Sequence, residues 1–296
     1  MSSMDRFIVQ REIASVASGK VLLCTDKMTQ KDVVVKRIRH TSGPEKAIHR
    51  HLSKLGGHEH VLQLLGDFTE AGYDHFVLEH CPKGELFDLV SRASRLEAPI
   101  ALHYFEQIVA GVAFIHRRGY AHMDLSLENV LVDAQGAMKV IDFGLAVAID
   151  RPQRNAVGKY FYMAPEMFTG ATYDAAAADI WSLGIMLFIM LTGNPPFSQA
   201  VPSDAVFEYV ANYGLRAIAT SWKVDHLIPA ATMDLLEQML SIDPAGRPRI
   251  DDILAAVTPV VETKPHKAEK AAKHNHVRAF LKNVFSHSSK KVAVWQ

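Results

Sequence analysis

Apolar residues follow a strand-like pattern in the first quarter of the chain. Runs of apolar or β-branched residues, bounded by polar ones, predict short strands at 7–9, 21–23, 32–38, 61–68 and 75–79. Between the third and fourth of these, Gly43-Pro44 opens a helical stretch that runs to about Leu55, and Gly56-Gly57 ends it. The first quarter therefore predicts a small sheet with one main helix.

After residue 84 the pattern becomes helical. Apolar residues recur at helical spacing through 100–115, and most of 174–257 is predicted to be helical, with short strands only at 130–132 and 138–141. A strand-rich segment followed by a helix-rich one predicts an α+β fold with two lobes. We expect the first lobe to span about 1–79 and the second about 82–258.

The charge changes sign near residue 258. The whole chain has 32 basic and 32 acidic side chains, but residues 263–296 carry seven lysines and one arginine against the single acidic residue Glu269. We therefore separate a basic tail at 259–296 from the body. Within the tail, 277–285 predicts a short basic amphipathic helix, which would suit a calmodulin-like or acidic partner. Packing on the helical lobe, or no fixed structure, is the other interpretation.

Several protein classes are excluded. Two cysteines, Cys24 and Cys81, are too few for a disulfide framework or a Cys-only zinc site and favour a reducing compartment. The first ten residues lack the apolar segment of a secretory signal, and Ser2 stands where myristoylation needs glycine. The longest apolar run, 180–191, is shorter than the ~20 residues of a membrane span. We expect a cytoplasmic or nuclear protein with no transmembrane segment and no nucleic-acid partner.

Short motifs then follow one another in a fixed order. The strand VVVK ends at Lys36, HMDLSLEN occupies 122–129, DFG occupies 142–144 and APE occupies 164–166. In order and spacing this set resembles the signature of the eukaryotic protein kinase family, over residues 7–258. The segment GELFDL at 84–89 is most similar to serine/threonine kinases of the calcium/calmodulin-dependent group. The resemblance implies a kinase domain at 1–258 with the bilobal kinase fold.

The resemblance also implies roles for individual residues. Lys36 would contact the phosphates of ATP, Asp142 and Asn129 would hold Mg²⁺, and Asp124 would accept the proton of the substrate hydroxyl. Glu166 and Arg247 would form a structural ion pair. The residues that the resemblance places around ATP are Ile13, Ala14, Ser15, Val16, Ala17, Ser18, Gly19, Lys20, Val21, Lys36, Glu79, Cys81, Glu85, Glu128, Leu131 and Asp142.

The loop expected to cover the phosphates departs from the family pattern. Of its three glycines only Gly19 remains, and Ala14 and Val16 occupy the other two places. A side chain limits the approach of backbone N–H groups to phosphate oxygens, and Val16 is the larger obstacle. We expect ATP to bind more weakly, or in a different pose, than with three glycines.

Three further positions depart from the family pattern. Two lie in the catalytic segment, residues 122–129, and one lies in the segment before APE. Met123 replaces the arginine that grips an activation-loop phosphate, and residues 145–162 contain no serine or threonine, so we expect activity without phosphorylation of that loop on Ser or Thr. Ser126 replaces a lysine that stabilises the transferring phosphoryl group, while Lys159 stands where the family has threonine. Our hypothesis is that Lys159 supplies the missing charge and acts in catalysis. A merely solvated Lys159 is the alternative.

The glutamate that should pair with Lys36 is absent from its usual place, since residues 48 and 49 are not acidic. Glu45 lies one turn earlier on the same helical face as Ile48, which makes it our candidate. A glutamate favoured there only by the helix dipole is the other interpretation.

Three functions fit these residues. We expect a protein serine/threonine kinase that transfers the γ-phosphate of ATP to a protein hydroxyl. The alternative is a pseudokinase that binds nucleotide or acts as a scaffold, which the loop substitutions favour and the intact Lys36, Asp124, Asn129 and Asp142 oppose. A kinase for small-molecule hydroxyls fits less well, because the APE segment belongs to the peptide-docking region of protein kinases.

Overall fold

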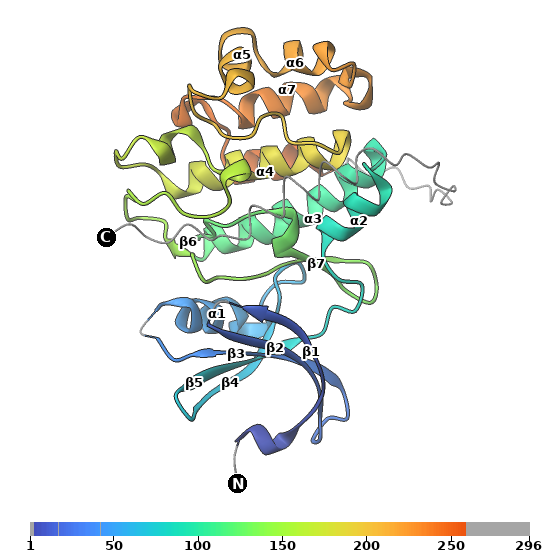
Figure 1. Cartoon of the computed structure of the whole chain (residues 1–296), viewed down its shortest axis with the longest axis vertical. Coiled ribbons are helices and arrows are strands. Elements are labelled where there is room, and N and C mark those ends of the chain that lie inside the picture. The colour runs from blue at the N-terminus through green and yellow to red at the C-terminus, as the bar shows by residue number, and fades with distance from the viewer. Residues whose placement is uncertain (1–2, 17, 42, 259–296) are drawn as a thin grey trace.

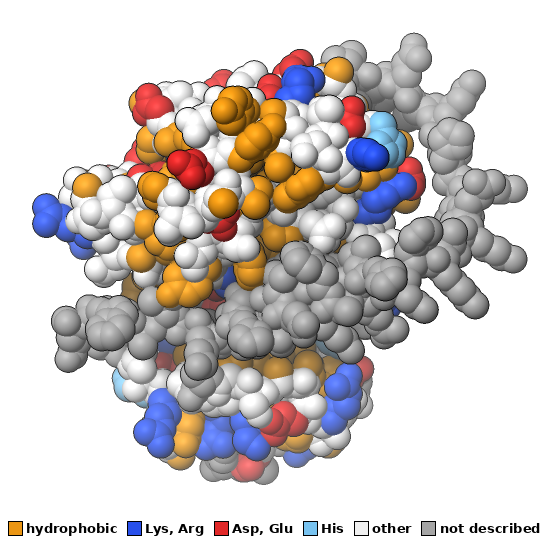
Figure 2. Space-filling view, turned by 45° about the horizontal axis from the view of Figure 1, so that its top comes forward, with side chains coloured by type: hydrophobic (Ala, Val, Ile, Leu, Met, Phe, Trp, Pro, Cys, Tyr) orange, Lys and Arg blue, Asp and Glu red, His pale blue; other side chains and the backbone are white. Residues whose placement is uncertain are grey.

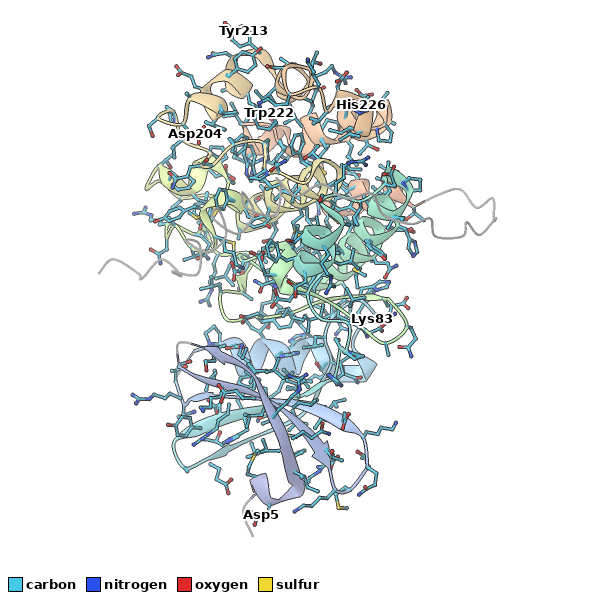
Figure 3. All side chains as sticks on the ribbon, turned by 45° about the vertical axis from the view of Figure 1, so that its right-hand side comes forward. Asp5, Lys83, Asp204, Tyr213, Trp222 and His226 are labelled. Carbon is cyan, nitrogen blue, oxygen red and sulfur yellow. The ribbon has the colours of Figure 1, made fainter. Side chains whose placement is uncertain are left out.

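The computed structural model describes residues 3–16, 18–41 and 43–258 and has two lobes that lie one above the other (Figure 1). Lys83, on the segment that joins the lobes, lies at the level of their junction (Figure 3). The expected division into a sheet-rich first lobe and a helical second lobe is confirmed. The tail at 259–296, with its expected helix at 277–285, lies outside the described residues.

The first lobe is a five-stranded antiparallel sheet in the order β1-β2-β3-β5-β4. A 3₁₀ turn at Ser3–Arg6 precedes it, and helix α1 (Glu45–Ser53) lies against it, followed by a 3₁₀ turn at Lys54–Gly56. The strands are β1 (Phe7–Val16), β2 (Gly19–Asp26), β3 (Asp32–Arg39), β4 (Leu64–Glu70) and β5 (Tyr73–Glu79).

Strands β2, β3 and β5 contain the predicted 21–23, 32–38 and 75–79 and extend beyond them, whereas the strands predicted at 7–9 and 61–68 differ more. The strand predicted at 7–9 continues to Val16, because β1 is an edge strand whose later residues are exposed, and the polar run Gln10 to Glu12 interrupts the apolar pattern. The strand predicted at 61–68 begins only at Leu64, because Val61 and Leu62 join the second lobe instead. Val61 forms an isolated bridge with Val140, and the Leu62 N–H donates to the Val140 carbonyl.

Strand β3 places its side chains alternately on two faces. Val33 and Val35 enter one apolar cluster with Phe7, Cys24 and Val77. Val34 and Ile38 pack on the opposite face, against a second cluster made of Leu62, Leu64, Phe76, Leu78 and Cys81. By the same alternation Lys36 shares the face of Val34, towards the second lobe. The sequence pattern of β3 therefore decides where its lysine points.

The second lobe is built around helix α4 (Ala175–Thr192), which is buried along nearly its whole length. The Asp174 side chain accepts from the N–H groups of Ala176 and Ala177 and so begins the helix, and Gly193 in the left-handed region ends it. The other helices are α2 (Leu86–Ala93), α3 (Ala98–Arg117), α5 (Ala205–Tyr213), α6 (Leu215–Ser221), α7 (Ala230–Met239) and α8 (Ile250–Val257).

Short strands and 3₁₀ turns line the side of this lobe that faces the sheet. Strand β6 (Tyr120–Ala121) pairs with β9 (Val147–Ala148), and β7 (Val130–Val132) pairs with β8 (Met138–Val140). Apolar side chains gather on the face of the helical lobe in Figure 2, while charged ones of both signs are spread over the sheet lobe. The remaining 3₁₀ turns are Leu127–Asn129, Tyr160–Tyr162, Pro165–Phe168, Asp225–Leu227 and Pro244–Gly246.

Helices α3 and α4 are long and apolar enough to cross a membrane by length and composition alone. Inside this lobe 89% of the α4 window and 44% of the α3 window are buried. The run at 180–191 therefore forms the core helix that the sequence predicts.

The expected ion pair at the base of the second lobe is confirmed. Arg247 donates from Nη1 to Glu166 Oε1 at 2.6 Å and from Nη2 to Oε2 at 2.8 Å. The guanidinium also donates to the Ala177 carbonyl and lies over the Trp181 ring, and its side chain is 1% exposed. This bidentate pair ties residues 165–168 to the turn before α8.

Candidate active site at the junction of the two lobes

Lys36 joins the two lobes through its ammonium group. Its Nζ lies 2.6 Å from Glu45 Oε1 on α1 and 3.1 Å from Asp142 Oδ1 in the second lobe. Burial lowers the pKa of Lys36, but the carboxylates of Asp142 and Glu45 outweigh that effect and raise the pKa above its ordinary value. Lys36 is therefore a fixed cation at neutral pH, held by one carboxylate from each lobe.

The expected pairing of Glu45 with Lys36 is confirmed. Glu45 lies one turn before the position where the family pattern places this glutamate. Glu45 is the first residue of α1, so it also lies where the helix dipole favours a negative charge. One turn later, His49 is buried and its Nε2 lies 2.8 Å from the Leu62 carbonyl oxygen. Burial lowers the pKa of His49 to about 4, so the neutral ring donates this hydrogen bond at pH 7.

Phe143 packs between the rings of His49 and His122. Its ring is fully buried and meets the His49 ring edge-on at 4.8 Å and the His122 ring at 5.5 Å between centroids. Asp142, the residue before it, has φ of 63°, in the left-handed region that costs a non-glycine residue about 1–3 kcal/mol. Packing of Phe143 between the two histidines stabilises a backbone that turns Asp142 towards Lys36.

Asp124 and Asn129 lie together on the catalytic segment. The Asn129 amide donates from Nδ2 to Asp124 Oδ2 at 2.9 Å and to the Asp124 carbonyl at 2.6 Å. The Asp124 N–H donates to His122 Nδ1 at 3.2 Å, and the His122 Nε2 in turn lies 2.8 Å from the Ile141 carbonyl oxygen. The Asp124 carboxylate is therefore fixed in direction by its neighbours.

Asp179 on α4 accepts hydrogen bonds from the same segment, a role that the sequence analysis did not assign. Its carboxylate accepts from the N–H groups of His122 at 2.7 Å and Met123 at 2.9 Å, and His116 Nε2 lies 2.8 Å away. Met123 has φ of 66°, which these two hydrogen bonds stabilise. Only the fold reveals this buried acceptor, because Asp179 lies 57 residues after His122 in the sequence.

Lys159 reaches back to the catalytic segment. Its Nζ donates to Ser126 Oγ at 2.8 Å and lies 3.6 Å from Asp124 Oδ1. Gly158 makes this approach possible, because a Cβ there would lie 3.0 Å from the Met123 carbonyl oxygen and 3.4 Å from Asp124 Oδ1. The lysine is thus placed beside the carboxylate and the serine, and a merely solvated side chain does not describe it.

Comparison with known proteins gives the family. A model of the protein kinase domain matches residues 7–257. The chain belongs to the protein kinase family. Rice (Oryza sativa subsp. japonica) CBL-interacting protein kinase 16 is 31% identical over 280 residues, 90% of this chain and 59% of that protein. Maternal embryonic leucine zipper kinase of Xenopus tropicalis is 34% identical over 202 residues, 67% of this chain and 30% of that protein.

A second rice relative, CBL-interacting protein kinase 30, is 42% identical over 148 residues, 48% of this chain and 31% of that protein. This kinase chain therefore spans between 30% and 59% of the length of these relatives. The similarity concerns the shared domain. It agrees with the resemblance to serine/threonine kinases of the calcium/calmodulin-dependent group.

In this kinase domain the expected phosphate-covering loop is the β1–β2 hairpin. A Cβ on Gly19 would lie 1.8 Å from the Arg37 carbonyl oxygen, so this glycine is required by the packing of β2 on β3. Lys20 Nζ pairs with Glu12 at 2.7 Å, and Ser15 Oγ donates to the same carboxylate. Ala17 lies outside the described residues. Of the three glycines expected in this loop, the retained Gly19 is therefore needed for the close packing of β2 on β3, whether or not a nucleotide is bound.

Three of the residues expected around ATP, at or beside the segment between the lobes, have different surroundings. Cys81 is buried among the apolar residues of the first lobe, and Leu131 from β7 packs against the same cluster. The Glu79 side chain instead accepts from the Gln63 N–H at 2.8 Å and pairs with Lys139 at 3.2 Å. Any contact of Glu79 with a nucleotide base would therefore come from its backbone.

Two further carboxylates lie on the second lobe near Lys159. Burial raises the pKa of Glu85, and the nearby charges of Asp88 and Glu128 act in the same direction. Glu128 Oε2 lies 3.5 Å from the hydroxyl of the buried Tyr162. Glu85 and Glu128 were expected around ATP, and they add negative charge beside the Lys159 ammonium.

The donor set suits magnesium. Asp142 and Asn129 supply a carboxylate and an amide, the hard oxygen donors that Mg²⁺ takes, and Mg²⁺ usually completes its shell with phosphate oxygens and water. Among residues 3–16, 18–41 and 43–258, no group of three or more His, Cys, Asp or Glu side chains is arranged as a metal cage. The residues fit a metal that arrives with a nucleotide phosphate.

Proposed function

We propose that this chain is a protein serine/threonine kinase that transfers the γ-phosphate of ATP to a hydroxyl of a protein substrate. The observation that carries this proposal is the pair of contacts from Lys36 to Glu45 and Asp142, across the two lobes, at 2.6 and 3.1 Å. Phosphoryl transfer depends mainly on positioning and on charge neutralisation. A buried cation fixed between two carboxylates supplies both for the phosphates of ATP.

Asp124 receives the substrate hydroxyl in this mechanism. Its carboxylate is 6% exposed and is held by the Asn129 amide at 2.9 Å, so it points in one direction before substrate arrives. A carboxylate fixed in this way orients the hydroxyl and accepts its proton as the new O–P bond forms. Bound Mg²⁺, held by Asp142 and the Asn129 side-chain oxygen, would neutralise charge on the phosphates.

Lys159 supplies the positive charge that Ser126 lacks. Its ammonium lies between the Ser126 hydroxyl and the Asp124 carboxylate, at 2.8 and 3.6 Å, beside the place where the hydroxyl and the γ-phosphate meet. A preorganised donor at a developing negative charge lowers the barrier by about 3 kcal/mol. The serine keeps the lysine in place, so the two residues exchange the roles that the family pattern gives to these positions.

Activity of this kinase needs no Ser/Thr phosphate in the segment 145–162. Its observed contacts hold the segment: β9 pairs with β6, Gln153 pairs with Tyr173, and Ser182 Oγ donates to the Tyr162 carbonyl at 2.7 Å. Tyr162 is 2% exposed, so Tyr160, at 41%, is the more accessible hydroxyl of the segment.

The basic tail at 259–296 is the second part of this proposal. Its charge and the apolar spacing at 277–285 support binding to a calmodulin-like or other acidic partner.

Transfer of labelled γ-phosphate from Mg-ATP to generic protein substrates tests the proposal. Wild type should phosphorylate serine and threonine, and Asp124→Asn should lower kcat by about 10²- to 10⁴-fold while it still binds ATP. A wild type that binds ATP but transfers nothing would identify a pseudokinase instead.

A further inference from the structure

The position of Glu45 depends on what holds helix α1. The helix has only nine residues, and isolated helices shorter than about 12 residues are marginally stable in water. Glu45 is its first residue, and Pro44 before it provides no side-chain cap. Contacts of α1 with the rest of the lobe must therefore fix Glu45 against Lys36.

Helix α1 contacts the rest of the protein through two groups of side chains. Glu45, Ile48, His49 and Leu52 recur at helical spacing, and the last three are buried, so this face meets Lys36 and Phe143. Lys46 and Arg50 lie four residues apart on the flank of this face, a spacing that puts both side chains on one stripe. That stripe meets acidic residues of β4 and β5.

The Lys46 ammonium makes two hydrogen bonds and a further ion pair with residues of β4 and β5. Its Nζ donates to Thr69 Oγ1 at 2.7 Å and to Asp74 Oδ1 at 2.8 Å, and lies 3.1 Å from Asp67 Oδ2. The side chains of Lys46, Asp67 and Asp74 are 18%, 8% and 6% exposed, so the contact is largely shielded from water. A charge pair shielded in this way is stronger than one at the surface.

Neighbouring residues complete the same cluster. Arg50 donates from Nε and Nη2 to the two oxygens of Asp67 at 2.7 and 2.5 Å. Asp74 also accepts from Thr69, and its Oδ2 lies 2.7 Å from His40 Nδ1, just before α1 begins. The hydrogen bonds from Lys46 and Arg50 act against the effect of burial and hold the pKa of Asp67 below its usual value. We call Lys46, Arg50, Asp67 and Asp74 the α1 anchor.

We propose that Lys46 is a positioning residue of this kinase: through the α1 anchor it holds Glu45 against Lys36. The inference rests on the proposed function, in which Lys36 binds the phosphates of ATP. Without the Lys46 ammonium, Asp67 and Asp74 become two buried carboxylates with less charge to balance them, and the first turn of α1 loses its attachment to the sheet. Glu45 then leaves Lys36, although neither residue has changed.

The test compares Lys46→Met, which keeps the aliphatic stem, with Arg216→Met. Arg216 forms an exposed ion pair with Asp234 and Glu237 on the far helices, so it is a matched loss of one cation. Lys46→Met and Glu45→Gln should each lower kcat by about 10- to 100-fold, while Arg216→Met should leave it unchanged. Lys46→Arg should restore most of the activity.

A double variant separates positioning from stability. On the Glu45→Gln background, Lys46→Met should cause less than about a two-fold further loss, because contacting sites that act through one pair are not additive. A loss as large as on the wild-type background would overturn the proposal, since Lys46 would then act without Glu45.

Hydrogen exchange of the α1 amides gives a readout that needs no turnover. In Lys46→Met these amides should exchange about ten-fold faster than in wild type, with the α4 amides unchanged. Equal exchange of α1 in both proteins would overturn the proposal even if the chain proved to be inactive. Faster α1 exchange in a chain without kinase activity would support the anchor and reject only the proposed function.

Discussion

Lys159 donates a hydrogen bond to Ser126 at 2.8 Å, across 33 residues of sequence. The family pattern resembled by this chain has lysine where Ser126 stands and threonine where Lys159 stands. The two positions have therefore exchanged a cation and a hydroxyl, and the ammonium still lies 3.6 Å from Asp124. In the proposed mechanism, the charge beside the transferring group comes from the segment that precedes the APE residues, and no longer from residues 122–129.

This exchange makes a specific prediction about catalysis. Lys159→Ala should lower kcat by about 10²-fold or more with little change in the KM for ATP, because the lost interaction belongs to the transition state. The double variant Ser126→Lys/Lys159→Thr should regain most of the activity, as it restores the family arrangement. Steady-state phosphate transfer measures both. Full turnover of Lys159→Ala would show that the ammonium is not used.

The held segment predicts independence from loop phosphorylation. Residues 145–162 contain no serine or threonine, and Met123 offers no cation for a phosphate. Treatment with a Ser/Thr phosphatase should leave kcat unchanged, and Tyr160→Phe should keep wild-type activity. Mass spectrometry of the treated protein provides the control that phosphate has been removed elsewhere. Loss of kcat after the Ser/Thr phosphatase treatment, or in Tyr160→Phe, would contradict the account.

Two substitutions in the β1–β2 hairpin, one that adds a glycine and one that removes a glycine, should change different properties. Val16→Gly should tighten ATP binding several-fold, because removing the branched side chain lets the backbone approach the phosphates. Gly19→Ala should lower the free energy of unfolding, because its Cβ would meet the Arg37 carbonyl. Calorimetric titration and chemical denaturation measure the two effects. An unchanged ATP affinity in Val16→Gly would show that this hairpin does not cover the phosphates.

Burial of His49 predicts a loss of stability in acid. The pKa of its ring is about 4 in the folded protein and 6.5 for an unperturbed imidazole, as in the unfolded chain. Between these values only the unfolded chain binds the proton, so stability is complete above pH 6.5 and falls by about 3 kcal/mol as pH falls to 4. Denaturant unfolding against pH measures this slope. Burial also lowers the pKa of His58 and His75, so wild type must be compared with His49→Gln, whose slope should be smaller.

The Glu166–Arg247 pair predicts a large effect on stability. Glu166→Gln leaves a guanidinium that is 1% exposed without its carboxylate, which costs about 3–5 kcal/mol. Asp234→Asn removes one acceptor of the exposed Arg216 and should cost less than about 1 kcal/mol. Unfolding free energies of the two variants test the difference. Equal small losses would mean that the buried pair adds little.

The sequence predicts those features that depend on local pattern. Alternation in β3 places Lys36, helical spacing places α3 and α4, and the order of motifs brings Asp124, Asn129 and Asp142 to one region. It also points to Glu45, since Glu45 shares a helical face with Ile48. The motif order depends on the resemblance to the kinase family, and the other features follow from neighbours within a few residues of one another.

Features that depend on long-range contacts were missed or left open. Asp179 holds the N–H groups of His122 and Met123 from 57 and 56 residues away, and nothing in its own segment shows this. The role of Gly19 also differs from the expected one, because its neighbour is the Arg37 carbonyl on another strand. Lys46 has the same character, since its acceptors lie on β4 and β5.

The balance between ATP consumed and phosphate gained by protein tests the central claim most directly. Wild type with Mg-ATP and a protein mixture should yield close to one phosphoserine or phosphothreonine for each ATP converted to ADP, and chelation of Mg²⁺ should stop both. ATP that is bound but not consumed, or consumed with no phosphate appearing on protein hydroxyls, would contradict the account.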